Sequence, residues 1–457
     1  MDGERWALYL AFGVESNDNT QILRASTQHR VSRINFSQNT EIAHAWAQYL
    51  AFGVKATPAS AALRVGQYNV IQSVRPPKWG ERKVGHDCRS QTNRGVSNCA
   101  KNRNINDLDF ETSISLAALT TLGVGGSARL LVRPQTQNEI QRALDKAKLE
   151  GLEVLVLGGG SNLLVSDSGV NALVLMLQNQ EIECVDRSDA SVVLKVGAAC
   201  VWDDFVKYCV ANGFSGVECM SGIPGSMGAA PIQNIGAYGQ EVAQVIESVR
   251  CVSKVDGTRH EYSNDACGFG YRTSHFKRGH LTQQIVTHVI LRLSLGPADA
   301  PRYPQLIRAC GVDCRDLRAL REAVIRLRRQ KSMIYDRQDP NHRSAGSFFV
   351  NPVVPAKAVS SVRAVLRQEN LEHEKMPCFP QHDGRFKLSA AWLMERSGFK
   401  KGFGDGRVGL STNHCLALVN RGGGTCEEIL TLMVRVQAGV LSKFGVRLEP
   451  EPVCWLS

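Results

Sequence analysis

Four polar residues lie in surroundings that packing alone does not explain. Ser347 is flanked by Gly346 and two phenylalanines, and Arg272 follows a tyrosine after a Gly-x-Gly. Lys331 ends a basic segment, and Glu451 stands between two prolines. A serine, an arginine, a lysine and a carboxylate can together hold an anionic substrate and supply a proton to it. Each also has an ordinary structural explanation, because serines beside glycine often form turns and long charged side chains are usually exposed.

The longest glycine-rich stretch, residues 221–239, holds five glycines, two prolines and almost no charge. It is too apolar for a solvated linker and too rich in glycine for a helix interior. Small residues let the backbone approach a ligand, and backbone N–H groups outside regular structure can bind an anion. A bound cofactor explains this composition, and a tight crossing of two core segments is the structural alternative.

A second glycine-rich stretch, Gly158-Gly-Gly-Ser-Asn162, follows an apolar run that predicts a buried strand. Its N–H groups can surround a pyrophosphate, and the serine and asparagine side chains add hydrogen bonds. The spacing is neither the dinucleotide-binding G-x-G-x-x-G nor a P-loop. The stretch therefore indicates phosphate binding without identifying the ligand.

Short strands and a smaller number of helices are expected to position these residues. Apolar runs predict strands at 128–133, 153–157, 163–165, 172–177, 192–196, 245–255, 260–262, 285–293 and 416–419. Helical spacing predicts helices at 138–150, 202–212, 317–330, 356–369, 388–396 and 426–444. Asp256-Gly257 predicts a hairpin turn, and residues 301–306 are expected to form a loop. Gly296-Pro297 marks an expected domain boundary near Leu295.

Composition indicates an ordinary globular protein, and its positive charge favours an anionic partner. Nucleic acid, a membrane surface and a nucleotide-type ligand all fit, and the sign of the charge does not choose among them. The 457 residues are 43% hydrophobic and 21% charged, with a net charge of +11. None of the 14 cysteines forms a Cys-x-x-Cys or a zinc-ligand spacing, which predicts buried thiols in a reducing cytosol and no bound metal. No apolar run reaches transmembrane length, so we expect a cytoplasmic protein without membrane insertion.

Residues 1–110 differ from the rest of the chain. They contain a small repeat, in which the segment at 9–14 recurs at 49–54, and a polar, basic stretch from 75 to 104. Two copies are too few for a solenoid. We expect an extension that is largely disordered. A nucleic-acid-binding or targeting arm and an appendage without a defined role both stay open for it.

Six motifs, in order along residues 113–452, resemble those of UDP-N-acetylenolpyruvoylglucosamine reductases, the MurB family. They are Thr121-Leu-Gly-Val-Gly-Gly126, Leu157-Gly-Gly-Gly-Ser-Asn-Leu163, the segment 224–239, Gly270-Tyr-Arg-Thr-Ser274, Ala345-Gly-Ser-Phe-Phe349 with Asn351-Pro352, and Leu448-Glu-Pro-Glu451. The resemblance implies an α+β fold with two parts. A two-part FAD-binding domain of the vanillyl-alcohol-oxidase type would occupy residues 111–295, and a smaller substrate-binding domain residues 296–457.

The implied reaction reduces UDP-N-acetyl-3-O-(1-carboxyvinyl)glucosamine to UDP-N-acetylmuramate in peptidoglycan precursor synthesis. FAD is the implied cofactor and NADPH the implied hydride donor. Ser347 would protonate the carbon beside the substrate carboxylate. Arg272 and Glu451 would stabilise the negative charge that develops there.

The resemblance also implies binding residues. Those expected to contact FAD are Gly158, Gly159, Gly160, Ser161, Asn162, Pro224, Gly225, Ser226, Gly228, Ala229 and Ile235. Those expected to contact the UDP-sugar are Tyr238, Tyr271, Tyr303, Lys331, Asn351 and His414. Tyr303 resembles the mobile tyrosine of one subclass, and Lys331 would meet the diphosphate. We expect a monomer that binds no nucleic acid.

Two other classes of function compete with this interpretation. An oxidase of the same fold would react with oxygen and often carry a covalently linked flavin. A basic nucleic-acid-binding protein would need aromatic residues interleaved with lysine and arginine on one surface. We find no such pattern, and aromatic residues make up only 7% of the chain.

Overall fold

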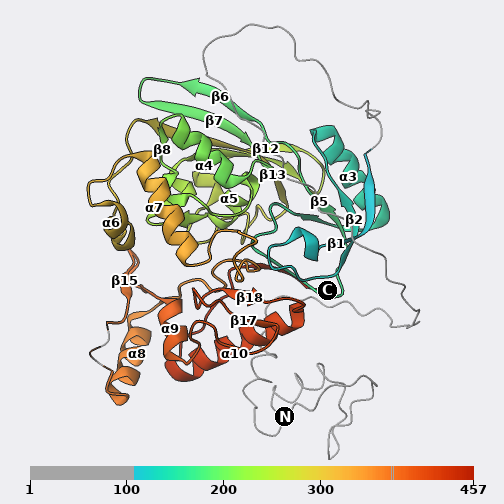
Figure 1. Ribbon diagram of the computed structural model, residues 1–457. Helices are drawn as coiled ribbons and strands as arrows, with labels where there is room; N and C mark the ends of the chain where they lie inside the picture. Colours follow the sequence, from blue (N-terminus) through green and yellow to red (C-terminus); the bar gives the residue numbers. More distant parts are fainter. Residues whose placement is uncertain (1–107, 372, 374, 457) are drawn as a thin grey trace, which may run out of the picture. The chain divides into compact units, whose positions relative to one another are not determined.

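The computed structural model describes residues 108–456 apart from 372 and 374 (Figure 1). The predicted extension at 1–110, with its repeat and basic stretch, lies outside the described residues except for its last three positions. Among the described residues, every helix is too short or too polar to traverse a bilayer. The described cysteines are free and most are buried, which confirms the prediction of buried thiols.

The first sheet has the strand order β1-β2-β5-β3 and carries helix α3. Its strands are β1 (Phe110–Ser115), β2 (Ser127–Val132), β5 (Val170–Leu175) and β3 (Glu153–Val156), and α3 spans Gln137–Glu150. Strand β2 pairs in parallel with β5, as does β3, whereas β1 is antiparallel to β2. Helix α3 is capped at its start by Thr136, which forms a capping box with Glu139. Its C-cap is Gly151, whose φ of 63° lies in the left-handed region that glycine adopts without strain. Ile140 and Leu144 of α3 pack in one core with Leu173 of β5.

The second sheet is antiparallel, in the order β12-β11-β13-β7-β6. Its strands are β6 (Ile182–Arg187), β7 (Ser191–Gly197), β11 (Ile246–Ser253), β12 (Arg259–Ser263) and β13 (Gln284–Leu295), and β8 (Phe214–Ser215) pairs with β13. The predicted hairpin at Asp256-Gly257 joins β11 to β12. Helix α4 (Trp202–Ala211) buries Trp202 and Phe205 in the core of this sheet. The glycine-rich segment after α4 forms α5 (Ala230–Gln233) and the two-residue strands β9 (Gly236–Ala237) and β10 (Gln240–Glu241).

Helices α6 (Pro304–Cys310) and α7 (Leu317–Gln330) pack on the core of the second sheet. Leu306 of α6 and Leu320 and Val324 of α7 belong to the same buried cluster as Trp202. Figure 1 shows α7 beside α4. The predicted boundary near Leu295, which stays a prediction, assigns both helices to the substrate-binding part, and their buried residues pack on the core of the second sheet. The predicted loop at 301–306 is wrong in its second half, because Pro304 opens a helix that Leu306 anchors in this core.

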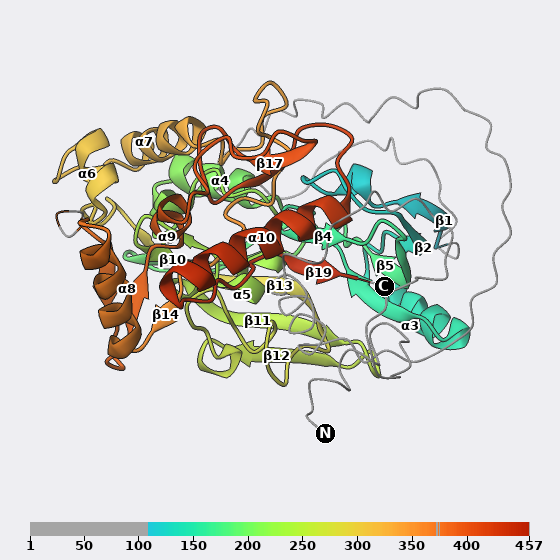
Figure 2. The same ribbon diagram turned by 90° about the horizontal axis from the view of Figure 1, so that it is seen from below.

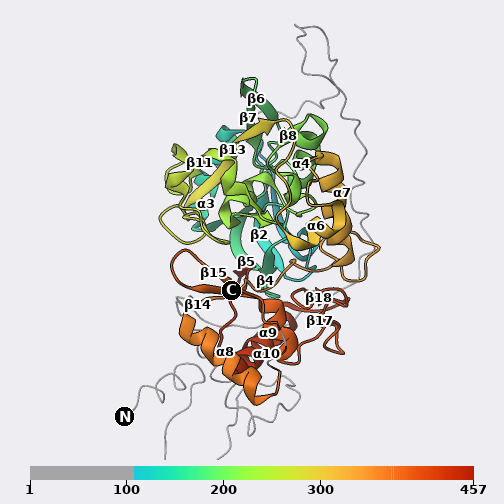
Figure 3. The same cartoon turned by 90° about the vertical axis from the view of Figure 1, so that its left-hand side faces the viewer.

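The C-terminal part contains α8, α9 and α10, with short strands between them. The bounds are β14 (Val353–Val354), α8 (Ala356–Gln368), β15 (Cys378–Pro380), β16 (Phe386–Leu388), α9 (Ala390–Arg396), β17 (Val408–Leu410), β18 (Leu418–Asn420) and α10 (Cys426–Phe444). Figure 3 shows the three helices grouped together below the sheets. The α+β class is confirmed by these elements.

Strand β19 (Val453–Trp455) returns to the first part of the fold. It pairs in parallel with β4 (Leu163–Val165), which directly follows the Gly158–Asn162 stretch. Figure 2 shows β19 close to β4 and α10. The pairing therefore places Glu451, two residues before β19, next to the first glycine-rich loop.

Candidate functional site

A cavity of about 310 Å³ lies where the two glycine-rich stretches meet. Its walls include residues 158–163, residues 223–226 and most of residues 229–236, and they also include Arg272, Ser347 and Glu451. We name it the glycine-lined cavity. Segments that lie far apart in the sequence therefore enclose one volume.

The two glycine-rich stretches approach each other too closely for side chains. A Cβ on Gly159 would lie 2.8 Å from the Cα of Gly225, and one on Gly158 would lie 2.5 Å from the Ser226 hydroxyl. The Ser161 hydroxyl donates a hydrogen bond of 3.0 Å to the Pro224 carbonyl and ties the stretches together. A narrow cleft walled by backbone is suited to a phosphate-bearing cofactor, because backbone N–H groups can approach the phosphates directly.

Most residues that the sequence assigns to FAD line this cavity. The lining members are Gly158, Gly159, Gly160, Ser161, Asn162, Pro224, Gly225, Ser226, Ala229 and Ile235. Gly228 does not line it: a Cβ there would lie 2.8 Å from the Cβ of Ala198, and its N–H donates to the Ala198 carbonyl at 2.9 Å. Gly228 therefore allows a close crossing of two segments at the end of β7. At this position the glycine has the structural role that we gave as the alternative to cofactor binding.

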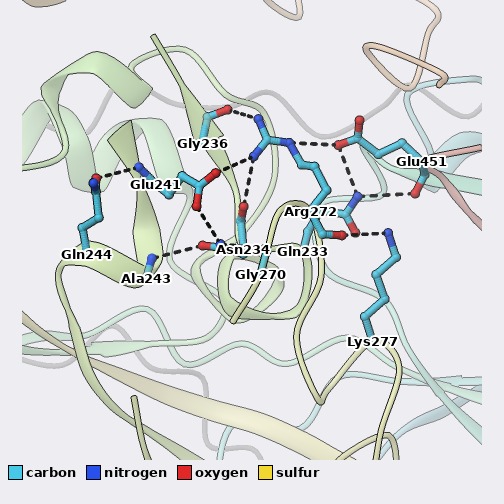
Figure 4. A network of polar contacts seen from close by, with 10 residues as sticks. All are labelled: Gln233, Asn234, Gly236, Glu241, Ala243, Gln244, Gly270, Arg272, Lys277 and Glu451. Carbon is cyan, nitrogen blue, oxygen red and sulfur yellow. Dashed lines mark hydrogen bonds and ion pairs between the residues drawn. The ribbon is translucent and has the colours of Figure 1, made fainter. Parts of the chain in front are cut away.

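The three residues assigned to the chemistry all line the glycine-lined cavity. The Arg272 Nε lies 3.6 Å from Glu451 Oε1, and Gln233 Nε2 donates to the same carboxylate oxygen at 3.2 Å (Figure 4). Arg272 also donates to the carbonyls of Asn234, at 3.2 Å, and Gly236. The guanidinium and the carboxylate are thus held as a pair at the edge of the cavity.

Backbone pairing sets Ser347 beside Glu451. The Glu451 N–H donates to the Phe348 carbonyl at 2.9 Å, and Phe349 pairs with Pro450. Phe348 and Phe349 are almost wholly buried and anchor this segment. Among the described residues, the Ser347 hydroxyl has no hydrogen-bond partner, and it borders the cavity where a ligand can take its proton.

Tyr271 and Asn351 lie next to the arginine, outside the lining of the cavity. The Tyr271 ring packs under the Arg272 guanidinium, 5.3 Å from its centre, and under the Lys387 ammonium at 4.6 Å. Burial raises the pKa of Tyr271, and this outweighs the opposing effects of Arg272 and of a hydrogen bond with Asn351. The phenol is therefore neutral and available as a hydrogen-bonding group. Arg272 itself adopts φ 54°, in the left-handed region that residues other than glycine seldom occupy.

Tyr238, Tyr303 and Lys331 form a second group outside the cavity lining. The two tyrosine rings meet edge to face at 5.4 Å, and Lys331 Nζ lies 5.9 Å from the centre of the Tyr238 ring. Lys331 also donates to Gln305 Oε1 at 2.6 Å. Tyr303 is 43% exposed at the N-terminal cap of α6, so it can reach a ligand bound beside Lys331.

His414 belongs to the same cationic region as Lys331. Burial, together with the smaller effects of the Lys331 and Lys401 charges, lowers its pKa to about 4. The Leu416 N–H donates to His414 Nδ1 at 3.3 Å, so the ring proton lies on Nε2. Burial and the nearby Arg328 and Lys401 charges also lower the pKa of Lys331. Within the described part of the chain, neither Lys331 nor Lys401 forms an ion pair with a carboxylate, and an anionic ligand would stabilise these cations.

Two residues of the site were not singled out from the sequence. Gln233 is 7% exposed and orients Glu451, and Arg328 of α7 lines the glycine-lined cavity with its buried Nε lacking a partner among the described residues. The sequence feature that could have pointed to Gln233 is its amide side chain, which stands inside an otherwise apolar, glycine-rich segment. No sequence feature distinguishes Arg328, because it is surrounded by several exposed arginines in one basic helix.

The fold and the site define a flavoprotein. A family model described as "FAD binding domain" matches residues 128–263, which include both glycine-rich stretches. A second model, "UDP-N-acetylenolpyruvoylglucosamine reductase, C-terminal domain", matches residues 338–455, which include Ser347 and Glu451.

Full-length relatives narrow the class to one family. A UDP-N-acetylenolpyruvoylglucosamine reductase of Thermobifida fusca is 42% identical over 348 residues, covering 75% of this chain and 97% of the relative. One of Nocardia farcinica is 43% identical over 349 residues, covering 75% and 88%. The crystal structure of the Thermus caldophilus reductase superposes with a TM-score of 0.53 at 27% identity, over 76% of this chain and 99% of that one. The chain belongs to the UDP-N-acetylenolpyruvoylglucosamine reductase family.

Proposed function

We propose that this protein uses FAD and NADPH to reduce UDP-N-acetyl-3-O-(1-carboxyvinyl)glucosamine to UDP-N-acetylmuramate. The observation that carries the proposal is the convergence of Ser347, Arg272 and Glu451 on the cavity walled by the FAD-binding segments. Membership of the reductase family supports the same reaction. This reaction is a step in peptidoglycan precursor synthesis.

The chain's own residues supply charge stabilisation and a proton. FAD, when bound and reduced, supplies a hydride to the outer vinyl carbon of the substrate. The substrate carboxylate and the carbon beside it then gain negative charge, which the Arg272 guanidinium stabilises more strongly than it stabilises the ground state. Ser347 donates its hydroxyl proton to that carbon, so that hydride and proton together saturate the double bond.

Glu451 orients Arg272 and receives support from Gln233. The Arg272 guanidinium is held by the Glu451 carboxylate, at 3.6 Å, and by the carbonyls of Asn234 and Gly236, which fixes it at the edge of the cavity for a substrate carboxylate. Tyr271 lies against Arg272 and is hydrogen-bonded to Asn351, which supports roles for both in holding the enolpyruvyl group.

The cationic region around Lys331 accounts for the nucleotide part of the substrate. Lys331 meets the diphosphate as a point charge. Tyr303 closes over the bound nucleotide, with Tyr238 behind it, and His414 Nε2 donates to a polar atom of the substrate. A monomeric state and a cytoplasmic location stay predictions.

A spectroscopic experiment tests the reaction. The purified, FAD-loaded protein is bleached with NADPH without oxygen and is then mixed with the enolpyruvyl sugar nucleotide. We expect the oxidised flavin spectrum to return on mixing. A spectrum that returns only with oxygen would contradict the proposal and indicate an oxidase.

The Ser347→Ala variant tests the proton donor. Flavin reoxidation by the substrate should slow by about 10²–10⁴-fold, the usual contribution of a positioned general acid. Bleaching by NADPH should be unchanged, because it does not need this proton. Ser361→Ala, on the exposed face of α8, is the matched control and should behave as the wild type. An unchanged reoxidation rate in Ser347→Ala would remove Ser347 from the mechanism.

A further inference from the structure

A second cavity, of about 560 Å³, shares no lining residue with the glycine-lined cavity. Its walls come from parts of three segments, within residues 117–123, 335–343 and 420–423, and we name it the arginine pocket. Its volume lies within the range of about 300–1,000 Å³ that small-molecule sites occupy. The proposed reaction assigns it no role.

The charge lining the arginine pocket is positive. Arg337 and Arg343 both line it, and no aspartate or glutamate does. Neither guanidinium has a carboxylate within ion-pair distance among the described residues. The nearby carboxylates of Asp336 and Asp339 instead accept backbone N–H groups within their own turn, at 3.0 and 2.8 Å. Two unpaired guanidiniums facing one cavity favour a ligand with phosphate groups, which arginine binds in a bidentate manner.

Two aromatic side chains complete one side of the pocket. The rings of Tyr335 and His342 meet edge to face with centres 5.9 Å apart. Tyr335 is 47% exposed, so part of its surface is available to a ligand. His342 Nδ1 is fixed by the Asp339 carbonyl at 2.6 Å, which sets the plane of its ring. The aromatic side suits an organic group attached to the phosphate.

Hydrogen bonds of one buried side chain join two further walls of the pocket. Asn420 is only 3% exposed, and its Nδ2 donates to the Leu122 carbonyl at 3.0 Å. Its Oδ1 accepts the N–H groups of Gly422 and Gly424, both at 3.0 Å. One buried amide thus joins the loop at 122–123 to the loop at 422–424. A preformed cavity costs less ordering on binding than one that must assemble.

We propose that the arginine pocket is a second ligand site, which binds a phosphate-bearing small molecule. Arg337 and Arg343 hold the phosphate groups, and Tyr335 contacts the organic part of the ligand. The proposal does not depend on the reaction assigned to the glycine-lined cavity.

Calorimetric titration of the FAD-loaded full chain with UDP, and separately with inorganic pyrophosphate, tests the proposal. We expect Arg337→Gln/Arg343→Gln to lose one equivalent of binding or to weaken it by about tenfold or more, because each guanidinium forms charge-assisted hydrogen bonds. The number of binding sites in the double variant is compared with that in the wild type. The difference is therefore the same whether or not the active site also binds UDP or pyrophosphate. Pyrophosphate that binds as tightly as UDP would mean that the phosphates alone are recognised. Tighter UDP binding that Tyr335→Ala removes would identify a nucleotide ligand.

Arg363→Gln/Arg367→Gln is the matched control, since it removes the same charge from the exposed face of α8. It should titrate as the wild type. Equal numbers of sites and equal affinities in the two double variants would overturn the proposal. A wild-type crystal soaked in UDP that shows no density between Arg337 and Arg343 would overturn it as well.

Discussion

At the scale of single residues, His414 shows how burial and neighbouring charge select one protonation state. Its folded-state pKa of about 4 lies below the ordinary value of 6.5, because of burial first and of Lys331 and Lys401 second. The neutral ring keeps one donor on Nε2, as the hydrogen bond from Leu416 to Nδ1 requires. A protonated ring would add a positive charge that the nearby Lys331 and Lys401 ammonium groups repel.

This shift predicts a pH dependence of stability. Between pH 6.5 and pH 4 the unfolded chain binds a proton at His414 that the folded chain does not bind. Stability therefore falls as the pH is lowered through this window, by about 1–3 kcal/mol from this residue. His414→Gln should lack this component, so its free energy of unfolding should fall less between pH 7 and pH 4.5 than that of the wild type. Urea unfolding of both proteins across this range checks the difference, and parallel curves would refute it.

At the scale of elements, the crossing of the two glycine-rich stretches decides whether the cofactor fits. Gly159→Ala would place a Cβ 2.8 Å from the Cα of Gly225, where no flexible side chain can move aside. The stretches would have to separate, and we expect FAD affinity to fall by about tenfold or more. Flavin absorbance per protein after equilibrium dialysis measures this affinity.

Gly406→Ala is the control for that substitution, since nothing lies within 4 Å of its added Cβ. It should retain the flavin content of the wild type. If Gly159→Ala keeps its flavin as well, the crossing has a structural role only.

The elements that the sequence predicts well are those with local signals. Helices α7 and α10 have the predicted bounds, and α3 begins within one residue of its predicted start. Their apolar periodicity and their caps lie within each segment, as at Thr136 before α3. The loop expected at 301–306 failed because Pro304, which also punctuates loops, here occupies the first turn of a helix.

The elements that the sequence does not predict depend on distant partners. Strands β1, β6 and β19 carry no decisive alternation, and β19 becomes a strand by pairing with β4. For the same reason the residue types at the site are readable from the sequence, whereas their convergence is not. Tertiary pairing brings Ser347 and Glu451 together, and no local pattern encodes that pairing.

At the scale of the whole molecule, one cavity unites parts of the chain that fold from different segments. The family models separate an FAD-binding region from a C-terminal region, yet Glu451 and Val453 of the latter line the same cavity as Gly158. The Val453 N–H donates to the Asn162 carbonyl at 3.0 Å. Cofactor binding and substrate binding are therefore expected to stabilise both regions together.

The return of residues 451–455 to the first glycine-rich loop also has a consequence during synthesis on the ribosome. Asn162 and Glu451 are 289 residues apart. At about 5–20 residues per second, the loop waits ~15–60 s before its partner exists. A ribosome-stalled chain that exposes residues 1–445 should retain no flavin on pelleting, whereas one that exposes residues 1–457 should retain it. FAD would then bind either in the final seconds of translation or after the ribosome has released the chain.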